Sequence, residues 1–241
     1  LISSTHFLRG KNSFRPVRCP LNGKQARGIL SLGVSSLITE VSSGIVMLLF
    51  NQILLSLSGN VGVAAYGIIA NLALIVVSIF TGVAQGIQPI VSRSFGSGQM
   101  RHVKQIFHYG VITAAAFGLL FLGIGWFFSQ PIVGIFNQEN NLEMERLASQ
   151  GLPLYFLAFP MMGVNILASS YLASLSKGGP AFVLSVLRGA AAVIPAVLLL
   201  SRLFGITGVW LAVPCAEALT FLVFLAMLPF CFRRPQKGAG A

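Results

Sequence analysis

Glu40 is the one charged residue in an apolar run that extends from Ile29 to Leu57. The run is longer than the roughly 20 helical residues that cross a bilayer. A carboxylate at that depth is costly unless it holds a proton, pairs with a cation or faces a watery cavity, so intramembrane acids are rare and usually functional. The alternative is a structural carboxylate that bonds to a neighbouring helix. We predict that Glu40 binds a cation or a proton.

Two further charges lie well inside later apolar runs. Glu217 follows Pro214 near the middle of one run, and Arg188 lies near the cytoplasmic end of another. At a rise of about 1.5 Å per helical residue, their predicted depths differ by only several ångströms. Because intramembrane charges usually find partners, Arg188 and Glu217 are predicted to form a structural ion pair. A second ion site is the alternative.

Little else in the sequence is suited to chemistry. The chain has no Asp, and its 3 His and 3 Cys show no metal-ligand spacing, which argues against a zinc site or a disulfide framework. It has no Gly-x-Ser-x-Gly or His-Glu-x-x-His motif, and the Gly96-Ser97-Gly98 loop lacks the Lys of an ATP-binding loop. We therefore expect no enzyme activity, no catalytic residue, no metal site and no cofactor.

The elements that must position these charges are membrane-spanning helices. Hydrophobic residues make up 55% of the chain and charged residues only 9%, whereas soluble domains carry about 25% charged residues. The apolar runs are long and unbroken, which favours helices over the alternating pattern of a barrel. We predict an all-α integral membrane protein with six transmembrane helices, at 29–57, 61–91, 106–128, 147–175, 181–204 and 206–230.

The distribution of basic residues predicts the orientation of the chain. Most Lys and Arg precede the first span, follow the sixth, or lie in the loop between the second and third spans. By the positive-inside rule both termini are cytoplasmic. The net charge of +11 then follows from loops that flank the membrane, and no nucleic-acid partner is needed. Three regions result: the end of a preceding helix and a basic linker (1–28), the six-helix bundle (29–230) and a basic tail (231–241).

Polar residues recur at helical spacing on three of the predicted spans. Positions three, four and seven apart share a helix face, and membrane helices turn polar faces away from lipid. The first stripe comprises Ser36, Glu40, Ser43, Met47 and Asn51; the second comprises Asn71, Ser78, Thr81, Gln85 and Gln88; the third comprises Tyr155, Met162, Asn165 and Ser169. We predict that they line a hydrated cavity, with hydrogen bonding between helices as the alternative for any single small residue.

Several of these segments resemble one family of transporters. Thr39-Glu40-Val-Ser-Ser-Gly44 resembles the opening helix of the C-terminal lobe of bacterial multidrug and toxic compound extrusion (MATE) transporters. The segments 60–71 and 82–89 and the loop Phe95-Gly96-Ser97-Gly98 resemble the same lobe. In that family two six-helix lobes surround a central cavity, and organic cations or drugs leave in exchange for inward Na⁺ or H⁺.

The resemblance implies that this chain is the C-terminal lobe of such an exporter in the bacterial plasma membrane. Glu40 would be the coupling-ion site, and the cavity would take small cationic organic substrates. The implied partners are membrane lipids and a missing N-terminal lobe. Many members carry a second acid on the tenth helix, where this chain has no acid and Asn165 is the most prominent amide.

Two alternatives remain. A lipid-linked oligosaccharide flippase of the same superfamily would need a cation-rich cavity, whereas Arg188 is the one cation that we place well inside a predicted span. A non-transporting truncated remnant is favoured by the first residue, which is Leu rather than Met.

Overall fold

The computed structural model describes residues 23–137, 140–175 and 177–231. The chain divides into two compact units, residues 1–38 and 39–241. The described part of the first unit, residues 23–38, is helical. All contacts below lie within the second unit. Most of the predicted basic linker and of the C-terminal tail lies outside the described residues.

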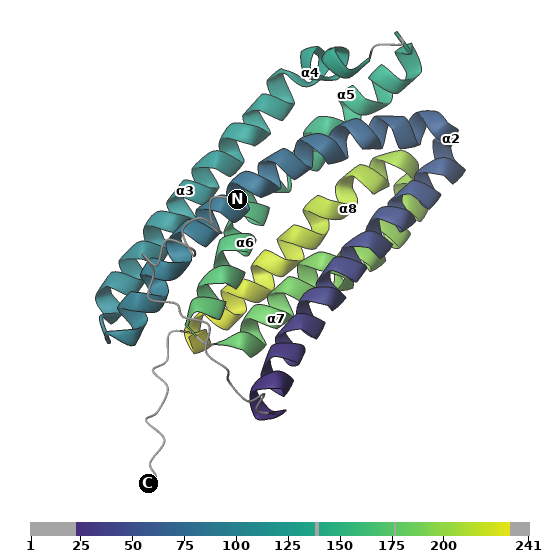
Figure 1. Cartoon of the computed structure of the whole chain (residues 1–241). Helices are drawn as coiled ribbons and strands as arrows, with labels where there is room; N and C mark the ends of the chain where they lie inside the picture. Colours follow the sequence, from purple (N-terminus) through teal and green to yellow (C-terminus); the bar gives the residue numbers. More distant parts are fainter. Residues whose placement is uncertain (1–22, 138–139, 176, 232–241) are drawn as a thin grey trace, which may run out of the picture. The chain divides into compact units, whose positions relative to one another are not determined.

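The described chain is helical and contains no strand (Figure 1). The elements are α2 (Gly23–Gly96), α3 (Met100–Phe127), α4 (Ser129–Phe136), α5 (Leu142–Phe156), α6 (Phe159–Ser174), α7 (Gly178–Val186), the π-helix η1 (Leu187–Ala191) and α8 (Val193–Cys231). The stretches Val41–Gly96, Met100–Phe127 and Gly178–Leu228 are long and apolar enough to cross a membrane, and α5 with α6 forms a further, bent candidate.

Two glycines divide the longest helices into pairs of spans. Gly59 in α2 has φ 63° and ψ −155°, and Gly205 in α8 has φ 58° and ψ −134°. A positive φ interrupts a right-handed helix and strongly favours glycine. Figure 1 draws α2 and α8 each as two arms joined at a sharp turn. Divided there, the four membrane-length stretches give six spans, as the sequence predicts.

The fourth predicted span is bent. The axes of α5 and α6 differ by 48° at the break between Phe156 and Phe159. Pro160 opens α6, and because proline lacks an N–H and clashes with the carbonyl four residues earlier, the helix that ends at Phe156 cannot run straight through. The bend places Tyr155 on one helix and Met162 and Asn165 on the next.

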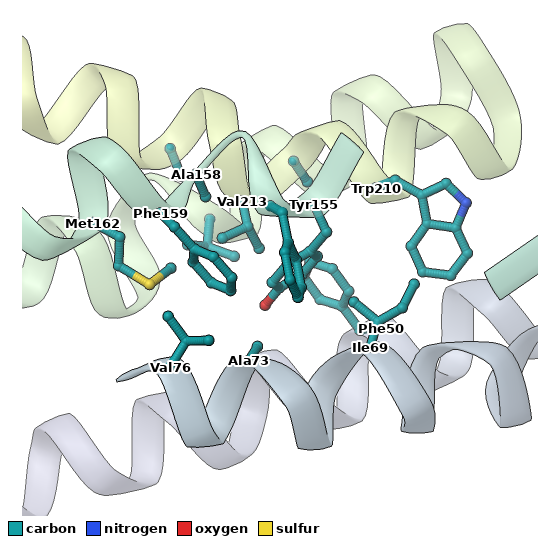
Figure 2. Close-up of a cluster of buried hydrophobic side chains, with 14 of the residues drawn as sticks. Phe50, Ile69, Ala73, Val76, Tyr155, Ala158, Phe159, Met162, Trp210 and Val213 are labelled. Atoms are coloured by element: carbon teal, nitrogen blue, oxygen red, sulfur yellow. The ribbon is translucent and has the colours of Figure 1, made fainter. Parts of the chain in front are cut away.

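The largest core cluster joins both arms of α2 to α5, α6 and α8 (Figure 2). Phe50 from the first arm of α2 stacks on Tyr66 from the second, with ring centroids 5.3 Å apart. Tyr66 in turn stacks on Trp210 of α8 at 6.4 Å. Since each buried aromatic side chain removes a large apolar area from contact with lipid or water, this stack stabilises the packing of α2 against α8.

Gly118→Ala is expected to destabilise the packing of α3 on α6. A Cβ at Gly118 would lie 2.5 Å from Pro160 Cα and 2.9 Å from the Phe159 carbonyl oxygen, and these backbone atoms cannot rotate away. Overpacking of this kind costs about 1–3 kcal/mol, so the melting temperature in detergent should fall. Gly123→Ala on the same helix is the matched control, because its Cβ meets nothing within 4 Å. Equal melting temperatures for the two variants would contradict this account.

Candidate functional site: a cavity with a buried ion pair

A cavity of about 410 Å³ lies inside the second unit. Its wall combines aromatic and apolar side chains with a small charged region. The lining residues are Ser43, Val46, Phe50, Tyr66, Val77, Tyr155, Met162, Ser185, Arg188, Gly189, Val193, Val213 and Glu217. They come from α2, α5, α6, α7, η1 and α8. Figure 2 shows Tyr155 and Val213 in the middle of the surrounding core, with Met162 and Phe50 on either side of them.

The charged region of the wall centres on Glu217, whose side chain is almost completely buried. Arg188 Nε donates a hydrogen bond to Glu217 Oε1 at 3.3 Å. Asn165 Nδ2 donates to Glu217 Oε2 at 2.7 Å and to the Glu217 carbonyl oxygen at 2.9 Å. The sequence-predicted partners Arg188 and Glu217 are therefore together, and Asn165 joins them from α6.

The buried carboxylate of Glu217 needs these hydrogen-bond donors to be stable. Glu217 is 2% exposed, and removing one partner of a buried ion pair typically costs about 3–5 kcal/mol because the other charge is stranded. The side chain of Arg188 is 24% exposed and forms part of the cavity wall. The two charges thus differ: the carboxylate depends on protein donors, whereas the cation can be solvated in part.

Asn165 holds the carboxylate with one end of its amide and leaves the other end unused. Its Oδ1 atom is buried and has no hydrogen-bond partner among the described residues. Reversing the amide would place an oxygen against Glu217 Oε2 and the Glu217 carbonyl, so a charged Glu217 fixes the observed orientation. A buried acceptor without a partner costs about 1–3 kcal/mol, which the two short bonds to Glu217 offset.

Arg188 is positioned by an irregular piece of helix. It lies in η1, where the Ala192 N–H bonds the Leu187 carbonyl five residues earlier at 2.9 Å. Single π-helical turns inside α-helices frequently occur at functional sites. The following residue, Gly189, also lines the cavity, and a Cβ there would meet no atom within 4 Å. The backbone beside the ion pair is therefore open to the cavity.

The predicted polar residues have different environments in the structure. Ser43, Tyr155 and Met162 line the cavity, and Asn165 is buried next to it. Met47, Asn71, Ser78 and Gln85 are exposed, Asn51 and Thr81 are half-buried, and Gln88 lines a separate hollow of about 340 Å³. The side chains of Ser36 and Glu40 lie outside the described residues. The role of the exposed residues in a transport cavity stays a prediction.

Sequence reasoning missed most of the cavity wall. Phe50, Tyr66 and Val213 carry no signal that separates a cavity-lining side chain from one that faces lipid. Arg188 and Glu217 were predicted as a structural pair, and their contact with the cavity was not foreseen. Their position inside apolar runs was the signal that could have found it, because intramembrane charges usually face a cavity or the bundle interior.

Membrane-length helices that enclose a cavity with a charged wall are typical of polytopic membrane proteins that bind small ligands. The MatE family model matches residues 33–198, and the chain belongs to that family. The family is that of multidrug efflux MATE transporters, as the segments around Glu40 predict.

Several curated relatives are named as multidrug export proteins. The multidrug export protein MepA of Staphylococcus aureus is 26% identical over 211 residues, which cover 86% of this chain and 45% of MepA. MepA of Staphylococcus haemolyticus is 26% identical over 199 residues, 83% of this chain and 42% of the relative. The chain thus spans about half the length of the curated relatives that it matches.

Solved structures share the fold. An outward-facing multidrug resistance MATE family transporter of the MOP superfamily superposes with a TM-score of 0.84 at 14% identity, covering 95% of this chain and 52% of that one. The Vibrio cholerae MATE transporter VcmN, in its bent form, gives 0.80 at 17% identity, with coverages of 96% and 52%. The predicted six-helix bundle, equivalent to one lobe of a larger transporter, is confirmed.

Proposed function

We propose that this chain is the C-terminal lobe of a secondary exporter that moves organic cations out of the cell in exchange for Na⁺ or H⁺. The observation that carries the proposal is the MatE match over residues 33–198, together with superposition on about half of a MATE transporter. The chain has one acid, Glu40, in the segment that resembles the opening helix of that lobe. Glu40 would bind the coupling ion, which would compete with the organic cation for a single negative charge.

Exposed polar residues support a second lobe. Asn71 and Gln85 are exposed on the second arm of α2, although lipid cannot satisfy an amide group. In repeat-built transporters the substrate site lies at the interface between the two halves, near the bilayer midplane. An N-terminal lobe that covers this face of α2 would enclose these side chains in a shared cavity.

Ethidium efflux tests the proposal. Cells that express this chain together with an N-terminal six-helix lobe should export ethidium faster than vector cells when an ion gradient is imposed. Efflux at the vector level, with both lobes present in the membrane, would contradict the exporter function. The flippase alternative has less support, because the described cavity wall carries Arg188 as its sole basic residue and a pyrophosphate ligand would need several cations.

We further propose that the loop at 97–99 faces the cytoplasm and that the N-terminal end of α5 faces outward, in the bacterial plasma membrane with both termini inside. The asymmetry of Lys and Arg supports this orientation. Cysteines would be introduced at Ser97 and Glu143, both exposed, in a chain whose native cysteines are replaced. An impermeant thiol reagent should label intact cells at position 143 and, only after permeabilisation, at position 97. The opposite pattern would reverse the orientation.

A further inference from the structure

The two donors that hold Glu217 differ in how tightly they bind it. Asn165 Nδ2 lies 2.7 Å from Oε2, whereas Arg188 Nε lies 3.3 Å from Oε1. Charge-assisted N–H···O bonds are usually about 2.7–2.9 Å long, so the contact of Arg188 is long for an ion pair. Asn165 therefore anchors the carboxylate, and Arg188 is the partner that can be exchanged.

The surroundings of Arg188 allow it to leave. Its side chain is 24% exposed, it lies on the π-helical turn η1, and it borders the open cavity next to Gly189. An arginine side chain can swing its charged head toward water while its stem stays on apolar surface. Glu217 has no such choice, because it is buried and needs a positive partner wherever Arg188 goes.

We infer that Glu217 is a cation-binding site whose built-in occupant is Arg188, and that an aromatic organic cation entering the cavity takes the place of the guanidinium. The exchange leaves Glu217 paired and moves Arg188 into the wet part of the cavity. It deepens the proposed function, because organic cations are the cargo proposed above. Its test is separate, because binding to this chain needs neither Glu40 nor a second lobe nor an ion gradient.

The remaining wall of the cavity selects the chemical class of the ligand. Phe50, Tyr66 and Tyr155 present aromatic surfaces, and Met162 adds a polarisable thioether. Aromatic faces attract weakly hydrated cations within about 6 Å. The volume of about 410 Å³ falls in the range of small-molecule sites, about 300–1,000 Å³. An anion is disfavoured, because capturing Arg188 would strand the buried carboxylate.

Equilibrium dialysis of tritiated tetraphenylphosphonium against the purified 241-residue chain in detergent tests the site, with a detergent-only chamber to correct for partitioning. Arg188→Gln removes the built-in competitor and should tighten tetraphenylphosphonium binding about tenfold or more. Glu217→Gln should weaken it by a similar factor. In the Glu217→Gln background, Arg188→Gln should give no gain, since the carboxylate for which the two cations compete is gone. Unchanged or weaker binding by folded Arg188→Gln would overturn the inference.

Two controls distinguish binding at this site from nonspecific hydrophobic binding and from the effects of misfolding. Tetraphenylborate has the same shape and the opposite charge, and Arg188→Gln should not tighten its binding; equal gains for both ions would contradict a charge-specific site. Gly189→Leu keeps both charges and fills open space beside Arg188, so it should weaken tetraphenylphosphonium binding about tenfold. Should Arg188→Gln fail to fold, undiminished binding by Gly189→Leu would by itself overturn the inference.

Discussion

Glu40→Gln is expected to abolish ion-driven efflux by the two-lobe transporter while leaving membrane insertion intact. Glutamine keeps the shape and the hydrogen-bonding capacity of the side chain but cannot hold a proton or balance a cation. An acid at this depth in the membrane is costly and is retained where it carries an ion or a proton. Ethidium efflux under an imposed Na⁺ or H⁺ gradient, normalised to the amount of protein in the membrane, measures the effect.

Glu143→Gln is the matched control for Glu40→Gln. Glu143 is an exposed acid in the first turn of α5, so the same chemical change there should leave efflux within about a factor of two of the unmodified level, since surface substitutions usually change little. Normal coupled efflux by Glu40→Gln would exclude Glu40 as the coupling site. Loss of efflux in a well-expressed Glu217→Gln that still binds tetraphenylphosphonium normally, with Glu40→Gln active, would place the coupling ion at Glu217 instead.

The spans and their breaks could be predicted because each has a local cause. A bilayer requires about 20 apolar residues in each helix. The few charged residues of this chain lie mostly between such runs, so they mark the ends of the spans. Gly59 and Gly205 interrupt the apolar runs at positions where the backbone has a positive φ. The meeting of Arg188 and Glu217 followed from depth alone, because two charges at similar depth in one bundle are strongly driven to pair.

The bend between α5 and α6 and the π-helical turn could not be predicted with the same reasoning. Both fall inside apolar runs that read as continuous spans. Pro160 was a local signal for the bend, but Pro153 lies inside α5 without ending it, so proline alone does not fix where the helix breaks. The turn at 187–191 has no comparable marker in the sequence.

The cavity depends on contacts between residues far apart in the sequence. Phe50 and Tyr66 meet because the two arms of α2 pack in one particular register, and Asn165 reaches Glu217 across 52 positions of the chain. Helical periodicity predicts which residues share a face of one helix. It does not predict which neighbouring helix packs against that face. Polar stripes therefore identified Ser43, Tyr155 and Met162 but also included residues, such as Ser78 and Gln85, that this lobe leaves exposed.

Expressed alone, the chain is expected to export no dye. Alternating access requires two halves that rock around a shared site. The exposed amides of α2, Asn71 and Gln85, would otherwise contact lipid, which offers them no hydrogen-bond partner. Ethidium efflux from cells that carry only this chain should therefore equal that of vector cells, and co-expression of an N-terminal six-helix lobe should restore it.

The matched comparison uses the same chain with and without the second lobe, at equal abundance in the membrane. Binding of tetraphenylphosphonium to the lone chain is expected to persist, since Arg188, Glu217 and the aromatic wall all lie within it. A lone chain that binds the cation but does not transport it would separate the site in this lobe from the machinery that moves the cation. Robust efflux by the lone chain would instead mean that two copies assemble into a working transporter, with the exposed face of α2 as their interface, and the requirement for a different second lobe would be wrong.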